Sequence, residues 1–129
     1  MKQIRLGLIG AGERGANCYA PYALKYPSEV KFVCAAEPLE ERRNAFSDRH
    51  QIPQADRFTD WREMFEKNYE LDGIIIATQD RQHYEPAMAA IAKGYHLLLE
   101  KPMAETAEKT RDIIHAAEKK GTFVMVCHV

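Results

Sequence analysis

The feature that most limits the fold of this sequence is a regular alternation between short apolar runs and segments with helical periodicity. The runs have the usual length of buried strands. Their apolar residues are consecutive, which is typical of parallel strands covered by helices on both faces. The runs predict six strands: Ile4–Gly10, Val30–Glu37, a weak Asp56–Thr59, Asp72–Thr78, Tyr95–Glu100 and Phe123–Val129.

Helical patterns fill the intervals between these strands. Pro21 lies inside the first pattern and should bend or shorten that helix. Leu39 and Phe46 are expected to point inward from the second helix, and Ile114 and Ala117 from the last. The expected helices cover residues 12–26, 39–50, 60–65, 84–91 and 106–120.

Local signals mark the ends of several helices. Asp60 is a capping residue before the third helix, and Gly94 and Gly121 are suited to end the fourth and fifth. No internal repeat or linker divides residues 1–129. Strands that alternate with helices at this spacing predict one α/β domain, a doubly wound parallel sheet of about six strands with helices on both faces.

Composition excludes several classes of partner. Apolar residues make up 46% of the chain and charged residues 29%, as in ordinary globular proteins. A net charge of −1 gives no reason to expect nucleic acid or an anionic membrane as partner. No segment resembles a signal peptide, and none approaches the roughly 18 apolar residues of a membrane span.

The cysteines indicate the compartment. There are three, Cys18, Cys34 and Cys127, widely separated and without a C-x-x-C spacing. This pattern argues against a disulfide framework or a zinc site and favours a reducing environment. We therefore predict a cytoplasmic protein without a bound metal.

The last apolar run, FVMVCHV, reaches the final residue of the sequence. Natural termini are more often polar tails or capped helices. From this pattern we expect a fragment, cut where one domain hands over to the next.

Residues 10–15 match the pattern G-x-G-x-x-G, directly after the first predicted strand. In such a loop the first glycine makes a tight turn, the second lets the backbone approach a pyrophosphate, and the third allows close helix packing. The anion lies against the free N–H groups of the helix start. One alternative is that the loop is a turn without a ligand. For Arg14, the alternative is a side chain that lies in solvent. The predicted phosphate loop comprises Gly10, Ala11, Gly12, Glu13, Arg14 and Gly15.

Glu37 supplies a second test of this interpretation. It ends the second predicted strand, 22 residues after Gly15, where dinucleotide-binding domains place an acid for the ribose hydroxyls. A carboxylate there repels a 2′-phosphate and so favours NAD over NADP. Arg42 and Arg43 keep NADP open, because a nearby basic residue holds a phosphate. The alternative is that Glu37 merely starts the next helix.

Two further segments narrow the class: ATQDRQHYEPAMAAIAKGYH at 77–96 and LLLEKPMA at 97–104. With the glycine loop, they make the chain resemble the nicotinamide-dependent Gfo/Idh/MocA oxidoreductases, the family of glucose–fructose oxidoreductase and inositol dehydrogenase. The resemblance covers essentially the whole chain. It implies that residues 1–129 form an NAD(P)-binding Rossmann domain. It also implies that a second domain, which supplies most of the substrate pocket and the subunit contacts, is absent here.

Carried over position by position, the resemblance places Gly10, Gly12 and Gly15 at the pyrophosphate and Glu37 at the adenosine ribose. It also places three residues beside the cofactor at the carboxyl end of the fourth strand: Thr78, Gln79 and Asp80. The rule that ligands bind where strand order reverses predicts the same place. Gln79 departs from the family, which often has proline there.

The resemblance assigns roles to two more groups. His83 occupies the family's usual histidine position and is expected to help position the cofactor; a helix-capping histidine is the alternative. In the family's E-K-P motif, the lysine points toward the substrate hydroxyl beside the nicotinamide. The matching residues are Glu100, Lys101 and Pro102.

Lys101 also has a case on chemical grounds. Hydride transfer from a secondary alcohol leaves a proton to be moved, so an acid or base must lie within hydrogen-bond reach of that oxygen. An ammonium group also stabilises a developing alkoxide. Pro102 restricts the backbone at Lys101 and disfavours helix there. The alternative is an ordinary surface lysine at a strand end.

These features predict the cofactor domain of an oxidoreductase that moves a hydride between NAD(P), with NAD preferred, and a sugar, polyol or related secondary alcohol. The full-length protein is expected to be a homo-oligomer, and this chain alone is expected to be inactive. One alternative is a non-catalytic dinucleotide sensor. Another is a nucleoside-cofactor transferase of the S-adenosylmethionine type, against which the third glycine and E-K-P count.

Overall fold

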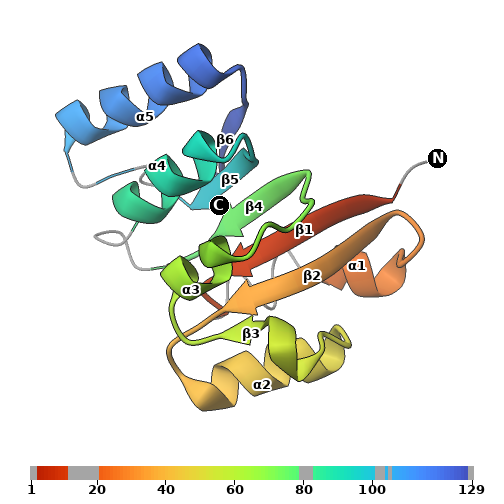
Figure 1. The fold of residues 1–129 in the computed structure, drawn as a ribbon. Coiled ribbons are helices and arrows are strands. Elements are labelled where there is room, and N and C mark those ends of the chain that lie inside the picture. The colour runs from red at the N-terminus through yellow and green to blue at the C-terminus, as the bar shows by residue number, and fades with distance from the viewer. Residues whose placement is uncertain (1–2, 12–20, 79–82, 101–103, 105, 128–129) are drawn as a thin grey trace.

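The computed structural model describes residues 3–11, 21–78, 83–100, 104 and 106–127. Within them lies a six-stranded parallel sheet in the order β3-β2-β1-β4-β5-β6 (Figure 1). The predicted α/β fold is confirmed. The strands are β1 (Ile4–Ile9), β2 (Val30–Ala36), β3 (Arg57–Phe58), β4 (Gly73–Ile76), β5 (His96–Glu100) and β6 (Val124–Cys127).

The helices of the described residues alternate with these strands. Pro21 opens the first helix rather than bending it, in a position where its missing N–H costs no helical hydrogen bond. The expected helix over 12–26 can be compared only at 21–25, because residues 12–20 lie outside the described ranges. The helices are α1 (Pro21–Lys25), α2 (Glu40–Arg49), α3 (Trp61–Glu66), α4 (Tyr84–Ala92) and α5 (Ala107–Lys120), with a short 3-10 turn η2 (Gln54–Asp56).

Strand order reverses at β1. Leu8 of β1 lies opposite Ala35 of β2 on one side and Ile75 of β4 on the other. The chain therefore builds outward from β1 to β3 and then crosses back to add β4, β5 and β6 on the far side of β1. Such a reversal leaves a crevice at the carboxyl ends of the strands, where α/β proteins bind ligands.

Two hydrophobic clusters cover the two faces of the sheet. One combines α3, α4 and α5 with the strands and includes Met64, Ile91 and Ile113. The other combines α1 and α2 with the opposite face and includes Ala23 and Phe46. Figure 1 shows α4 and α5 side by side, away from α1 and α2. The prediction of helices on both faces is confirmed.

Two predicted core residues are wrong. Leu39 is 53% exposed because α2 begins at Glu40, which leaves Leu39 as an extended residue before the helix. Ile114 is 41% exposed, while its neighbour Ile113 is fully buried with Ala117. Each helical step turns the side chain by about 100°, so the docking of α5 on the sheet selects one isoleucine of the pair.

The predicted helix ends are confirmed at three places. The Asp60 carboxylate accepts a hydrogen bond from the backbone N–H of Arg62 at 2.8 Å and starts α3. Gly94 and Gly121 adopt φ of +84° and +78° after α4 and α5.

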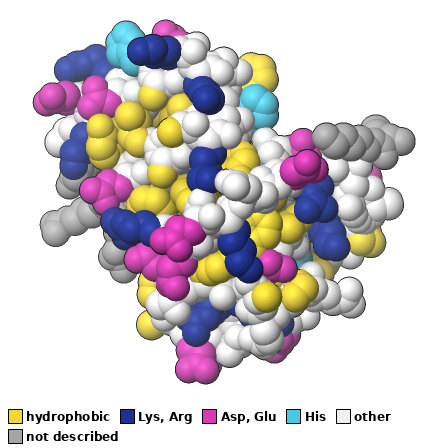
Figure 2. Space-filling view, in the orientation of Figure 1, with side chains coloured by type: hydrophobic (Ala, Val, Ile, Leu, Met, Phe, Trp, Pro, Cys, Tyr) yellow, Lys and Arg dark blue, Asp and Glu magenta, His cyan; other side chains and the backbone are white. Residues whose placement is uncertain are grey.

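Figure 2 shows acidic and basic side chains interspersed on the face in view, in keeping with the net charge of −1. Among the described residues, no helix is long and apolar enough to cross a membrane.

Candidate functional site

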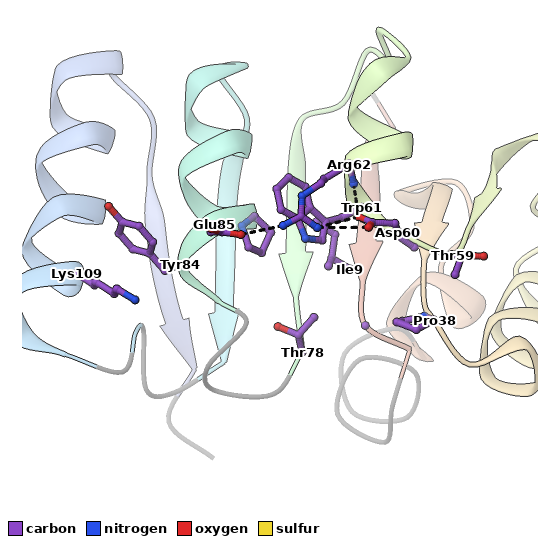
Figure 3. Close-up of a pocket in the computed structure, with 13 residues that line it drawn as sticks. Ile9, Pro38, Thr59, Asp60, Trp61, Arg62, Thr78, Tyr84, Glu85 and Lys109 are labelled. Carbon is purple, nitrogen blue, oxygen red and sulfur yellow. Dashed lines mark hydrogen bonds and ion pairs between the residues drawn. The ribbon is translucent and has the colours of Figure 1, made fainter.

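A cleft of about 830 Å³ opens at the carboxyl ends of the central strands. Its floor comes from the ends of β1, β2 and β4, and its walls come from the starts of α3 and α4 with a contribution from α5 (Figure 3). The crevice expected from the strand order is therefore present. The lining residues are Ile9, Gly10, Ala36, Pro38, Thr59, Asp60, Trp61, Arg62, Thr78, Tyr84, Glu85, Pro86 and Lys109.

Gly10 occupies the point where β1 meets the end of β4. Its φ is +91°, a conformation that side-chain-bearing residues rarely adopt. A Cβ at this position would lie 2.8 Å from the carbonyl carbon and oxygen of Ala77 and 2.9 Å from the Thr78 nitrogen. Both backbone conformation and space thus require glycine, as the tight-turn interpretation predicts.

Glu37 is buried at 5% exposure and connects two loops. Its Oε1 accepts a hydrogen bond from the Ala11 backbone N–H, and its Oε2 accepts one from the Leu39 N–H, both at 2.8 Å. It therefore lies outside α2, contrary to the alternative in which it starts that helix. A carboxylate offers about four acceptor positions, and the described residues use two of them. Sequence reasoning missed the bracing of the two loops.

A basic group bonds to the backbone at Glu37. The half-buried Arg43 donates from Nη1 to the Glu37 carbonyl at 2.8 Å and to the Pro38 carbonyl at 3.4 Å. Arg42 is exposed. Groups of both charges therefore lie near the end of β2, and these charges exclude neither NAD nor NADP.

Thr78, after β4, and His83, before α4, are in contact with each other. His83 is fully buried, and its Nε2 lies 2.9 Å from the Thr78 carbonyl oxygen. It stands before α4 without capping that helix through its side chain, contrary to the capping alternative. The Thr78 hydroxyl is buried and has no hydrogen-bond partner within the described part of the chain. A buried hydroxyl without a partner marks a place that a ligand can satisfy.

Several predicted site residues lie outside the described residues: Gly12, Glu13, Arg14, Gly15, Gln79, Asp80, Lys101 and Pro102. Glu100 is the last residue of β5, where it pairs with Cys127 of β6. Because the sheet is parallel, Glu100 ends its strand at the same edge as Ile9, Ala36 and Ile76. The end of β5, where the E-K-P motif begins, therefore lies at the same edge of the sheet as the cleft.

One wall of the cleft has a contact that sequence reasoning missed. The Arg62 guanidinium carbon lies 4.4 Å from the centre of the Trp61 ring, and Arg62 Nη2 lies 2.8 Å from the Glu85 carboxylate (Figure 3). The segment DWREMF indicated only a helix with a cap at Asp60. A tryptophan followed by arginine, directly after a strand at the carboxyl edge, was the available signal.

Cys34 is not a candidate nucleophile. Cys34 lies fully buried within β2, and this burial raises the pKa of its thiol to about 12. At neutral pH the thiol stays protonated, and the thiolate is the reactive form.

The reversal of strand order, the obligatory Gly10 and the buried acid at the end of β2 define a dinucleotide-binding α/β domain. Residues 4–128 match the model of the oxidoreductase family with an NAD-binding Rossmann fold, GFO_IDH_MocA. The chain belongs to this family. The resemblance seen in the sequence is thereby confirmed.

Relatives of known identity support this assignment. The chain is 27% identical to scyllo-inositol 2-dehydrogenase (NADP(+)) IolW of Bacillus subtilis, over 97% of this chain and 33% of that protein. It is 29% identical to trans-1,2-dihydrobenzene-1,2-diol dehydrogenase of Sus scrofa, over 95% of this chain and 36% of that one. The chain thus spans about a third of the length of these relatives.

A solved structure confirms the fold. The WlbA dehydrogenase from Chromobacterium violaceum, determined with NADH and UDP-GlcNAcA, superimposes with a TM-score of 0.87 at 22% identity. The match covers 98% of this chain and 35% of that one.

Proposed function

We propose that this chain is the cofactor domain of an NAD(P)-dependent oxidoreductase that moves a hydride between the nicotinamide and a sugar, polyol or related secondary alcohol. The observation that carries the proposal is the presence of both Gly10 and Glu37 at the carboxyl ends of β1 and β2, where the strand order reverses. Gly10 lacks the side chain that would collide with the backbone at Ala77 and Thr78, and the Glu37 carboxylate holds the Ala11 N–H. The named relatives are dehydrogenases.

Each residue of this edge receives a role in binding. The loop from Gly10 to Gly15 holds the pyrophosphate on its N–H groups, and the Glu37 carboxylate accepts the adenosine ribose hydroxyls. Glu37 leads us to prefer NAD, because its charge opposes a 2′-phosphate. The Thr78 hydroxyl, which has no partner among the described residues, donates to the cofactor. His83 positions Thr78 through the bond to its carbonyl. Gln79 and Asp80 border the same side.

Lys101 is the group that we assign to the proton. When bound, the nicotinamide ring accepts or donates the hydride. The Lys101 amine takes the proton from the substrate hydroxyl as the hydride leaves, and in the reverse direction the ammonium returns it; the ammonium form also stabilises negative charge on that oxygen. Glu100 and Pro102 fix the strand end that carries it. Substrate recognition, and the contacts of a homo-oligomer, belong in this proposal to a second domain. The sparse cysteines lead us to place the protein in the cytoplasm.

Neither alternative gains support from the comparisons. The matched family and the cited relatives are oxidoreductases, which disfavours both a non-catalytic sensor and a transferase that uses S-adenosylmethionine.

Calorimetric titration of the chain with NAD+, NADP+ and S-adenosylmethionine tests the proposal. NAD+ is expected to bind, and Glu37→Ala is expected to weaken it roughly tenfold, or about 1.4 kcal/mol. NADP+ should lose less, because its 2′-phosphate makes no favourable contact with the carboxylate. Equal losses for the two cofactors would mean that Glu37 only braces the loops.

The matched control is Asp72→Ala. Asp72 also accepts a backbone N–H bond at 2.8 Å, from Arg5, but at the amino edge of the sheet. Its loss should leave the affinity for NAD+ unchanged. If the folded wild-type chain binds neither nicotinamide cofactor, the proposed function is wrong.

A further inference from the structure

Three side chains form a continuous contact along one wall of the cleft. The Arg62 guanidinium lies over the Trp61 indole at 4.4 Å and pairs with Glu85 at 2.8 Å, so it links the start of α3 to the start of α4. Both oxygens of Asp60 lie 3.3 Å from Arg62 Nη1 and hold the other side of the guanidinium. Figure 3 shows Arg62 extended across Trp61 toward Glu85. We call the indole and guanidinium the Trp61–Arg62 stack.

This arrangement has little to do with the stability of the fold. The side chains of Arg62 and Glu85 are 58% and 69% exposed. Ion pairs between such exposed groups contribute little to the free energy of unfolding. The planar guanidinium is nevertheless held in one orientation by two carboxylates and a ring. A flat, oriented surface of this kind is suited to stacking a planar ligand.

The position of the stack indicates which part of a dinucleotide lies on it. Asp60 and Trp61 follow β3, and the same cleft is lined by Pro38, which follows β2. Glu37, assigned above to the adenosine ribose, also lies at the end of β2. The strand end assigned to the hydride chemistry, at Glu100, is on the opposite side of β4. The stack therefore lies on the adenosine side of the cleft.

We propose that the Trp61–Arg62 stack, held in place by Glu85, is the surface on which the purine ring of the cofactor lies. This inference rests on the proposed function, because the purine belongs to the NAD(P) assigned to the cleft. Nucleobases stack on tryptophan rings and on guanidinium planes. Glu85 and Asp60 act as positioning residues, because their carboxylates hold the guanidinium over the indole.

Trp61 offers a direct readout, since it is the only tryptophan of the chain. Titration with AMP is expected to change its fluorescence in a saturable manner, whereas nicotinamide mononucleotide should leave it unchanged. Arg62→Ala should weaken AMP and NAD+ by about five- to tenfold in calorimetry. Arg62→Lys should lose nearly as much, because lysine keeps the charge but has no plane to stack. Glu85→Gln should lose less than either.

Lys67→Ala is the matched control. Lys67 lies at the other end of α3, where its ammonium group is 5.5 Å from the Phe58 ring centre and 3.9 Å from Asp56. Its removal also deletes an exposed cation from an aromatic ring, but outside the cleft. Affinity for AMP should not change in this variant.

The outcomes separate the two proposals. If NAD+ binds and Arg62→Ala retains full affinity for AMP, the stacking inference is wrong and the proposed function stands. A fluorescence change with nicotinamide mononucleotide instead of AMP also overturns the inference. If AMP binds through Arg62 but neither nicotinamide cofactor binds, the purine surface stands and the proposed function falls. If no nucleotide binds the folded chain, both fall.

Discussion

The two edges of the sheet use their polar groups in different ways. At the carboxyl edge, Glu37 and His83 bind the backbone of neighbouring loops, and the Thr78 hydroxyl is left without a partner among the described residues. At the amino edge, several polar groups form hydrogen bonds with one another. Asp72 accepts the Arg5 N–H at 2.8 Å, and the buried Tyr95 donates to the Tyr69 carbonyl at 2.8 Å.

Tyr69 continues the amino-edge network, because its hydroxyl donates to Asp56. Burial, reinforced by that bond, raises the pKa of the Tyr69 phenol. The phenol therefore stays neutral and keeps its proton in the bond throughout the physiological range. These amino-edge groups thus form a structural network, although the Thr122 hydroxyl before β6 has no partner among the described residues, whereas the carboxyl edge positions loops around an open cleft. Parallel strands place these two edges at opposite ends of the domain, so binding and stability can be altered separately.

The largest effect that would test this contrast compares two glycines. Gly10→Ala at the carboxyl edge should lower the free energy of unfolding by about 3 kcal/mol, since it combines a positive φ with contacts below 3 Å to backbone. Gly94→Ala at the amino edge, with φ +84° and its nearest neighbour at 3.7 Å, should cost about 1 kcal/mol. Urea unfolding measures both losses. Equal losses would show that the space beside Gly10 is not restrictive.

At the amino edge, His50 is an exception to this network of hydrogen bonds, and its effect on stability depends on pH. His50 ends α2 between the rings of Phe32 and Phe46, and its Nε2 has no partner in the described ranges. Burial first, and the Arg49 charge second, lower the pKa of His50 from 6.5 to about 4. Between these values the unfolded chain binds a proton that the folded chain does not, so acid favours unfolding.

Stability from the neutral His50 should be complete above pH 6.5 and decline as the pH falls toward 4. Because the ring retains some solvent contact, we expect a loss of about 1–2 kcal/mol rather than the full value of the shift. Unfolding of the wild type and of His50→Leu at pH 7 and pH 4.5 measures this loss. The variant should lose less on acidification; an identical loss would exclude His50 as its source.

The smallest effect concerns the amino-edge network. Tyr95→Phe removes the bond to the Tyr69 carbonyl and should cost about 1 kcal/mol of stability. Affinity for NAD+ should be unchanged, because this contact lies at the opposite end of the sheet from the cleft. A variant that keeps its stability but loses affinity would reverse the contrast between the edges.

The sequence by itself determined the strands, their parallel arrangement and the requirement for Gly10. These features depend on local periodicity and on the conformational freedom of single residues, which neighbouring sequence reveals. The choice between Ile113 and Ile114 could not be made in this way, because both fit a helical stripe until α5 is docked.

Only the tertiary structure decided which side chains meet across the cleft. Glu37 braces Ala11, which is 26 residues away in the chain, and Arg62 meets Glu85 across 23 residues. No local pattern encodes such pairs, because each depends on how two loops or helices are placed by the sheet between them. The sequence therefore indicated where a dinucleotide would bind, while the packing of α3 against α4 created the surface proposed for its purine.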